Sequence, residues 1–196
     1  MRDKIISKAT DLFLKLGFKS VTMDDIACEM CISKKTIYKF FKNKERLVKE
    51  ATEASHMKIH KILNGIISKN HNAIEENFEI RRMFKEMFQS FDKSPAYQLK
   101  KHYPDIYEKI MKTEIENYSK IFKQNIIKGI SEGLYRPETD IETAITFYYA
   151  LIFSIHENTQ LGKETNSLET QALEYHTRAI ATKNGIEELE KQLSNT

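Results

Sequence analysis

Basic and hydroxyl side chains gather in one short stretch of the sequence. Between residues 34 and 49, seven basic residues occur with a single acid, Glu45; they are Lys34, Lys35, Lys39, Lys42, Lys44, Arg46 and Lys49. Thr22, Ser33, Thr36 and Tyr38 add hydroxyl groups to the same stretch. Ammonium and hydroxyl groups are donors with which proteins contact the phosphates and base edges of DNA. The stretch therefore predicts binding of a nucleic acid.

Two short helices, joined by a tight turn and followed by the start of a third helix, would position these side chains. Apolar residues recur at helical spacing on both sides of a break at residues 31–33: Ile26, Ala27 and Met30 before it, and Ile37, Phe40 and Phe41 after it. Thr22, Ser33 and Asn43 can cap the three helix starts, and Thr22 with Asp25 approximates a capping box. We expect Ile37, Phe40 and Phe41 to be buried. Two crossed helices, the second of them basic, describe a helix-turn-helix that binds DNA.

The stretch also resembles the DNA-binding signature of TetR/AcrR-type transcriptional regulators. The family pattern is roughly IA…GVS..TLY.HF.NKE.L, and it is matched by IA at residues 26–27 and by ISKKTIYKFFKNKE at residues 32–45. The close match covers about residues 5–48. Cys31 replaces the turn glycine of the pattern, and Phe40 replaces its usual His or Tyr. A non-glycine residue at a left-handed turn position costs about 1 kcal/mol, which a folded protein tolerates.

The matched motif assigns a role to individual side chains. Lys34, Lys35, Thr36 and Lys39 are candidates for contacts to base edges, because they lie at the start or on the exposed side of the second helix. Tyr38 and Thr22 are candidates for phosphate contacts through their hydroxyls, and Lys44 for a phosphate contact at the next helix start. Ser33 is expected to be a helix cap first and a phosphate contact second. The candidate DNA-binding residues are thus Thr22, Ser33, Lys34, Lys35, Thr36, Tyr38, Lys39 and Lys44.

The composition predicts an all-α protein. Of the 196 residues, 40% are hydrophobic and 30% are charged, only three are Pro, and no region alternates apolar and polar residues for long enough to predict a sheet. Residues 1–50 contain 12 Lys and Arg against 7 Asp and Glu, a net charge of +5, whereas the remainder is net −2. A basic first quarter on a slightly acidic body suggests that the nucleic acid contacts this quarter alone.

Helical periodicity continues along the rest of the chain. We predict helices over residues 2–16, 44–69, 73–91, 95–101, 105–132, 140–161 and 167–193, with a polar loop at 162–166. The architecture expected is an N-terminal three-helix helix-turn-helix head (residues 1–46), joined by a long connector helix to a C-terminal helical body. This body, residues 47–196, would bind a ligand and form a dimer. The body of the family is variable, and the resemblance is weaker there.

The segment from Ala144 to Ile155 is apolar almost all round, which predicts a helix that other parts of the protein cover on every side. The resemblance implies that the last two helices pair with their copies in a four-helix dimer interface, and a homodimer would place two heads on a palindromic double-stranded operator. Half-sites would then lie about one helical turn of 10–10.5 bp apart, or a small multiple of it. The alternative is a helix buried inside a larger monomeric core.

The resemblance further implies a small-molecule effector that is held between the middle helices and moves the connector helix. Met and aromatic residues at core-like spacing are candidates for lining its site, although core packing explains them equally well: Met83, Met87, Phe88, Tyr103, Tyr107, Phe122, Tyr148 and Tyr149. His156 and Glu157 could orient a polar group, and a buried or interface polar pair is the favoured interpretation. The function that follows is a ligand-responsive, DNA-binding repressor.

Cys28 and Cys31 are the only cysteines, and their spacing is CxxC. A zinc site would need two more ligands, and no His or other Cys lies close in sequence. We expect ordinary small residues in a reducing cytoplasm. The alternative is a redox switch, because a disulfide here would distort the turn that orients the second helix.

His56 and His60 lie four residues apart, but a solvated helix face explains them better than a metal site.

Motifs of catalysis are missing from the sequence. It contains no GxSxG, no HExxH and no glycine-rich phosphate loop, so we expect neither an enzyme nor a bound cofactor or metal. A second interpretation keeps the helix-turn-helix but makes the chain an architectural or protein-binding scaffold without effector response.

The first residues lack the apolar core of a signal peptide, and the apolar run at 144–155 is too short to span a bilayer. We therefore expect a cytoplasmic protein without membrane contact.

Overall fold

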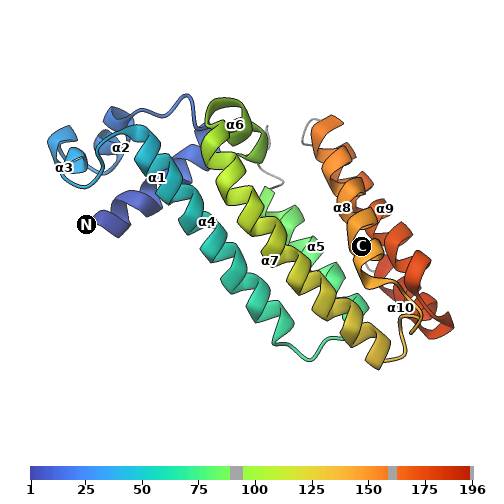
Figure 1. The fold of residues 1–196 in the computed structure, drawn as a ribbon. Coiled ribbons are helices and arrows are strands. Elements are labelled where there is room, and N and C mark those ends of the chain that lie inside the picture. Colours follow the sequence, from blue (N-terminus) through green and yellow to red (C-terminus); the bar gives the residue numbers. More distant parts are fainter. Residues whose placement is uncertain (89–94, 159–162, 195–196) are drawn as a thin grey trace. The chain divides into compact units, whose positions relative to one another are not determined.

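The computed structural model of the protein describes residues 1–88, 95–158 and 163–194 (Figure 1). These residues confirm the all-α prediction, since beside the helices they contain only one isolated bridge, between Tyr135 and Ala181. The helices are α1 (Arg2–Leu16), α2 (Met23–Glu29), α3 (Lys34–Tyr38), α4 (Lys44–Ile67), α5 (Ala73–Phe88), α6 (Pro95–His102), α7 (Pro104–Ser131), α8 (Ile141–Asn158), α9 (Lys163–Ile180) and α10 (Lys183–Ser194).

The chain forms two compact units, each made of two segments. The head unit comprises Met1–Ile62 and Lys93–Lys112, and the body unit comprises Leu63–Asp92 and Thr113–Thr196. Helices α4 and α7 therefore each begin in the head unit and end in the body unit. The functional division at residue 46, into a DNA-binding and a regulatory domain, stays a prediction.

The head unit is built around α1. Its predicted apolar stripe is buried, with Ile5, Ala9 and Phe13 no more than 1% exposed. The helix ends at Gly17, whose φ of 91° suits glycine and whose N–H donates to the Phe13 carbonyl at 2.9 Å. Helix α6 packs beside this turn, since a Cβ on Gly17 would lie 2.4 Å from the Gln98 Oε1. Glycine is therefore favoured here for the backbone angle, and a larger residue would also have to displace the end of the Gln98 side chain.

Segments distant in sequence complete the core of the head unit. Leu99 from α6, with Ile106 and Ile110 from the first turns of α7, belongs to the same buried cluster as the helix-turn-helix. Burying such side chains stabilises a fold by about 1.5–3 kcal/mol each. The head unit therefore depends on residues that follow α5 in the chain.

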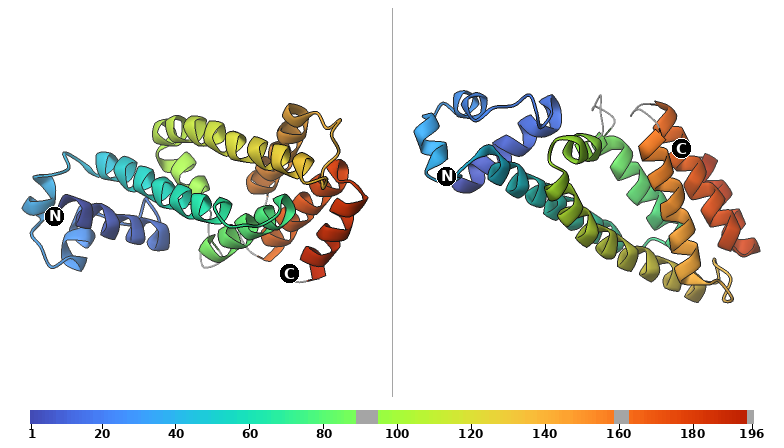
Figure 2. Two further views of the ribbon diagram at one scale, coloured as in Figure 1. Left: turned by 90° about the horizontal axis from the view of Figure 1, so that it is seen from below. Right: turned by 45° about the horizontal axis from the view of Figure 1, so that its top comes forward.

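The body unit combines an apolar core with a buried polar network. Figures 1 and 2 show α8 and α9 side by side, with α10 next to α9. Asn125 joins α7 to α5, because its Nδ2 donates to the Glu76 Oε1 and the Ala73 carbonyl while its Oδ1 accepts from Asn77 at 2.8 Å. The Lys128 ammonium neutralises the buried Glu76 carboxylate at 2.8 Å. A network with its partners satisfied fixes how the two helices pack.

The final helix differs from the prediction. A single helix over residues 167–193 was expected after a polar loop. Instead, α9 already begins at Lys163, and residues 181–182 interrupt the helix before α10. The backbone at this interruption bonds to a distant segment, because the Arg136 N–H donates to the Ile180 carbonyl and the Thr182 N–H donates to the Leu134 carbonyl. Thr182 then caps α10 by accepting from the Gly185 N–H at 3.1 Å. These long-range bonds replace the helical bonds at this point.

The other predicted helices agree with the structure to within three residues at the ends that it describes. The predicted ends at residues 91 and 161 lie outside the described residues. The same holds for the side chains of Phe88, His156 and Glu157. The sequence offers Asp140 or Thr139 as the cap of α8, and in the structure the Asp140 Oδ1 accepts from the Thr143 N–H at 3.2 Å.

Candidate nucleic-acid interface

The first helix of the motif starts at the predicted capping box. The Thr22 Oγ1 accepts from the Asp25 N–H at 3.2 Å, and the Asp25 Oδ2 accepts from the Thr22 N–H at 2.8 Å. The bond from the Thr22 backbone is the main reason why the pKa of Asp25 lies below its usual value. Because both polar groups are exposed, the box fixes the start of α2 while Thr22 stays at the surface.

The turn after α2 is closed by two hydrogen bonds. The Cys31 N–H donates to the Cys28 carbonyl and the Ile32 N–H donates to the Ala27 carbonyl, both at 3.0 Å. Cys31 has a φ of 53°, which makes it the only non-glycine residue with positive φ among those described. This pairing is the Schellman motif, in which the left-handed position is usually glycine. The predicted left-handed conformation of Cys31 is confirmed.

The second helix, α3, is short and capped. The Ser33 Oγ accepts from the Thr36 N–H at 3.1 Å and lies 2.8 Å from the Thr36 Oγ1, which confirms the predicted cap. Ile37 is fully buried under the helix, and Phe41 follows it into the same core. Asn43 caps α4 by accepting from the Arg46 N–H at 2.9 Å. Three caps and a buried anchor thus hold α3 in one orientation.

The basic side chains of this region differ in their partners. Among the residues that the structure describes, Lys35, Lys39 and Lys42 are exposed and form no ion pair. Lys34 donates to the Asp24 Oδ2 at 2.8 Å, and this bond raises the pKa of Lys34. Uncompensated charge therefore lies at Lys35, Lys39 and Lys42, where it is available to an anionic partner.

Lys44 is placed differently from the other lysines. Its Nζ donates to the Lys19 carbonyl at 3.1 Å and lies 5.9 Å above the centre of the Phe13 ring. Partial burial lowers the pKa of Lys44. Its ammonium therefore supports the loop before α2, and its contact with DNA phosphate stays a prediction.

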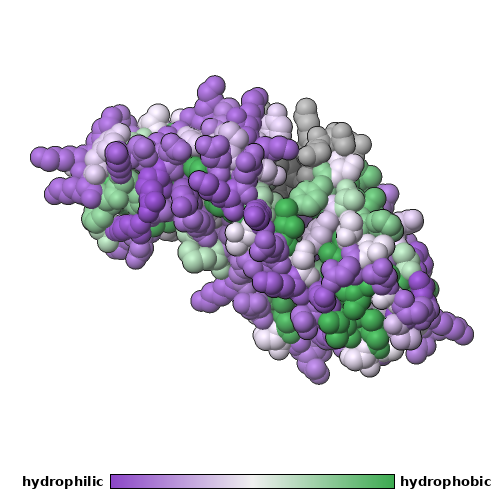
Figure 3. Space-filling model, viewed as in Figure 1, coloured by the Kyte–Doolittle hydropathy of each residue, from purple (hydrophilic) through white to green (hydrophobic). Residues whose placement is uncertain are grey.

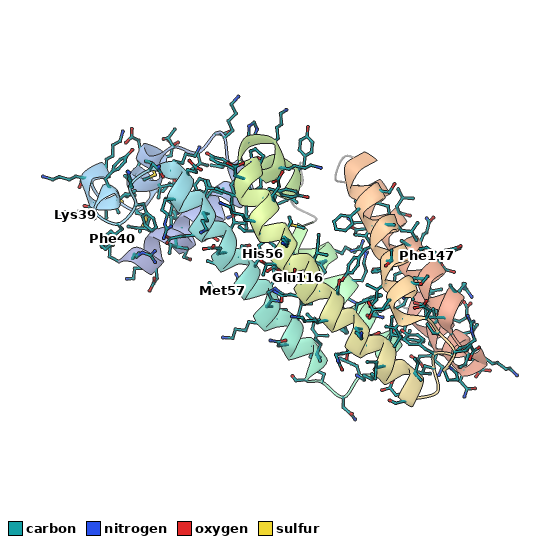
Figure 4. The ribbon with its side chains drawn as sticks, viewed as in Figure 1. Lys39, Phe40, His56, Met57, Glu116 and Phe147 are labelled. Carbon is teal, nitrogen blue, oxygen red and sulfur yellow. The ribbon has the colours of Figure 1, made fainter. Side chains whose placement is uncertain are left out.

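Phe40 is not the core residue that its spacing suggests. Its side chain is 40% exposed where α3 ends, next to Lys39, and Tyr38 is 45% exposed (Figure 4). Helix α3 ends at Tyr38, and in the segment that follows it Phe41 packs into the core while Phe40 stays outside. The expectation that Phe40 is buried is therefore wrong. The surface around α3 thus includes two aromatic rings among its lysines.

Sequence reasoning did not single out Arg81 and His176, which are buried in the body unit. The Arg81 Nη2 donates to the Asn166 carbonyl at 2.9 Å and pairs with Glu169 at 2.5 Å, whereas its Nε and Nη1 have no partner. The His176 Nε2 is also buried without a partner, and burial lowers the pKa of His176 to about 4. Arg81 and His176 lie in polar segments of the sequence, so residue type and spacing did not indicate that they are buried.

Five of the eight predicted effector residues pack against one of the two cores. Phe122, Tyr148 and Tyr149 pack against the core of the body unit, with the Phe122 and Tyr148 rings stacked 4.7 Å apart. Tyr103 and Tyr107 pack against the core of the head unit. The role of all eight in effector binding stays a prediction.

One face of α8 and α9 carries exposed apolar side chains. Phe147 is 66% exposed and Leu151 is 37% exposed on α8, and Tyr175 is 70% exposed on α9. Hydrophobic side chains reach the surface over α8 in Figure 3, and Figure 4 labels Phe147 on this helix. Large apolar side chains that are exposed next to one another on a helix are candidates for a protein–protein contact.

The described part of the chain contains no group of three or more His, Cys, Asp or Glu residues that could hold a metal ion. His56 and His60 do not form part of such a group. None of the described helices combines the length and the apolar character that crossing a membrane requires.

Comparison with known proteins identifies the motif. Residues 5–51 match the family described as bacterial regulatory proteins, tetR family. The biofilm-operon negative transcriptional regulator IcaR of Staphylococcus aureus is 27% identical over 134 residues, which cover 68% of this chain but only 65% of IcaR. The uncharacterized HTH-type transcriptional regulator YhgD of Bacillus subtilis is 30% identical over 190 residues, with 82% of this chain and 87% of YhgD covered.

The fold gives the same result. A transcriptional regulator from Cytophaga hutchinsonii aligns with a TM-score of 0.76 over 92% of this chain and 98% of that chain, at 15% identity. At this identity the likeness concerns the fold alone. This likeness in fold covers both the helix-turn-helix and the helical body, and YhgD adds 30% sequence identity over most of both chains. The chain therefore belongs to the TetR family of bacterial regulatory proteins.

Proposed function

We propose that this protein is a ligand-responsive repressor that binds a palindromic operator as a homodimer. The observation that supports it most is α3, which presents Lys35, Lys39 and the exposed Tyr38 on a helix fixed by caps at Thr22, Ser33 and Asn43. A short rigid helix with uncompensated positive charge fits the major groove of DNA. The name of IcaR, a negative regulator, supports repression as the direction of control.

Members of this family are regulators, and the family thus confirms the expectation that the chain is not an enzyme. The family also agrees with the expectation that no cofactor is bound. We expect the protein in the cytoplasm, where a bacterial operator is found.

The apolar face of α8 and α9 supports the homodimer. Phe147, Leu151 and Tyr175 would be covered by the same residues of a second copy, as in an isologous two-fold interface. Two heads related by that axis would contact two half-sites, because one helix of five residues covers too few base pairs for useful specificity.

The buried polar atoms of the body unit support effector binding there. Arg81 and His176 keep hydrogen-bonding atoms without partners. The Phe122 and Tyr148 rings lie 5.1 and 5.0 Å from the His176 ring, and the charge of Arg81 acts on Tyr148. A buried polar atom without a partner costs about 1–3 kcal/mol, and a ligand with matching groups would recover this energy. We therefore propose an effector site at Arg81 and His176, next to Phe122 and Tyr148.

Selection of bound DNA from a random pool tests the proposal. We expect a palindromic consensus and a complex whose protein mass corresponds to a dimer. Lys35→Ala should weaken binding and relax the preference at one base pair, by about 1–3 kcal/mol of discrimination. Lys112→Ala is the matched control, because Lys112 is also an exposed lysine of the head unit but lies on α7. A metabolite screen for release of the selected DNA then tests effector response.

Two outcomes contradict the proposal. Binding without any consensus would support the alternative of an architectural or protein-binding scaffold. Equal loss of affinity in Lys35→Ala and Lys112→Ala would show that charge alone, and not α3, determines binding.

A further inference from the structure

Two thiols occupy fixed positions of the turn between α2 and α3. Cys28 lies in the last turn of α2 and Cys31 is the left-handed residue of the Schellman motif, and both are free and exposed. The hydrogen bond from the Cys31 N–H to the Cys28 carbonyl, 3.0 Å long, closes a four-residue turn. In such a turn the first and last Cα atoms lie within about 7 Å of each other. Disulfides join Cα atoms that are about 4.4–6.8 Å apart, so the turn brings the two residues close enough for a bridge to be considered.

We propose that Cys28 and Cys31 are a modification site, at which a peroxide oxidises the two thiols to an intramolecular disulfide that weakens DNA binding. Formation of the disulfide does not depend on the proposed function, whereas its effect on DNA binding rests on the proposed function. Since the sequence contains no other cysteine, no third thiol of the chain competes for the partner.

The reaction balances with one peroxide per disulfide. The first thiolate attacks a peroxide oxygen, the O–O bond breaks, and the sulfur becomes a sulfenic acid as one water leaves. The second thiolate then attacks that sulfur, the S–S bond forms, the S–O bond breaks, and a second water leaves. The protein loses two protons and two electrons, and the peroxide takes up both. A thiol reductant reverses the change by thiol–disulfide exchange.

The disulfide acts on DNA binding through the backbone of the turn. Its bond requires the two Cβ atoms to approach to about 3.5–4.5 Å, a closer distance than two free thiols need. Cys31 is held by its own hydrogen bond, and the next residue, Ile32, is bonded to the Ala27 carbonyl. Ser33, the cap of α3, follows directly. A change of the backbone at Cys31 on disulfide formation would therefore change the direction in which α3 leaves the turn.

Mass spectrometry of the whole protein tests the chemistry without DNA. Hydrogen peroxide should remove both titratable thiols of the wild type and lower the mass by about 2 Da, the two hydrogens lost, and dithiothreitol should restore both. Cys28→Ser and Cys31→Ser should show no such loss. A disulfide between two copies, or only oxygen-adding oxidation of the wild type, would overturn the proposal.

Binding to the selected operator tests the consequence. Oxidised wild type should bind about tenfold more weakly or worse, which corresponds to about 1.4 kcal/mol, and the reductant should restore affinity. Cys31→Gly keeps the left-handed turn without a thiol, so its binding should not respond to peroxide. If verified disulfide-containing protein binds as tightly as reduced protein, the switch is refuted. If reduced protein binds no DNA at all, the proposed function fails instead, and the mass measurement still decides whether the disulfide forms.

Discussion

His176 should make the body unit lose stability in mild acid. The imidazole is 5% exposed, its Nε2 has no partner, and the Phe122 and Tyr148 rings lie about it at 5.1 and 5.0 Å. Burial lowers the pKa of His176 to about 4 from an ordinary 6.5. Burial also raises the pKa of Tyr148, so this neighbour stays uncharged and supplies no charge that would favour the imidazolium. The folded protein therefore resists protonation of His176, and the unfolded chain does not.

The sign and size of the effect follow from these pKa values. Above pH 6.5 both states hold a neutral imidazole, and stability is at its maximum with respect to this group. As pH falls below 6.5 the unfolded state takes up a proton first, and the free energy of unfolding falls until the folded state also protonates near pH 4. Each pKa unit corresponds to about 1.4 kcal/mol, so the loss between pH 7.5 and pH 5.0 is about 2 kcal/mol.

Urea unfolding followed by circular dichroism measures this loss. We compare wild type and His176→Gln at pH 7.5 and pH 5.0, because the two proteins share every other titrating group. His176→Gln should be less stable than wild type at pH 7.5 and should lose about 2 kcal/mol less on acidification. Equal pH dependence of the two proteins would refute the argument, since it would mean that the imidazole is accessible to protons when folded.

Three further substitutions test the packing. Phe147→Asp should convert the proposed dimer to a monomer in sedimentation, and a dimer that persists in this variant would mean that α8 is not part of the interface. Gly129→Ala places a Cβ 2.2 Å from the Tyr135 ring and should lower the free energy of unfolding by about 1–3 kcal/mol, whereas Gly65→Ala, with nothing within 4 Å, should not lower it. Asn43→Ala removes the cap of α4 and should lower it by about 1 kcal/mol; no change would mean that water replaces the cap.

The helix-turn-helix could be predicted from the sequence because its determinants are local. The capping box of Thr22 and Asp25, the Ser33 cap and the left-handed Cys31 each involve residues within three positions of one another. Local hydrogen bonds of this kind are visible in residue type and spacing. The candidate DNA-binding residues other than Lys44 accordingly lie on or beside α2 and α3.

The features that escaped prediction depend on partners distant in sequence. Nothing near Thr182 indicates that residues 134–136 will take the backbone bonds that end α9. Likewise, the side chain of Lys44 turns to the Lys19 carbonyl, and Arg81 is buried by an ion pair with Glu169. Phe40 is a different case, because α3 ends at Tyr38 and helical spacing does not predict which of the two aromatic residues after its end is buried.

The supply of head-unit core residues by α6 and α7 limits how the protein can be divided. A fragment that ends at residue 62 would contain the whole helix-turn-helix but would lack Leu99, Ile106 and Ile110, so part of its core would face water. Completion of the head core during synthesis therefore needs the residues of α6 and the start of α7, and it closes a loop through which the chain passes into the body unit and back. A transplanted head that keeps its whole core would have to include these residues as well as the first segment.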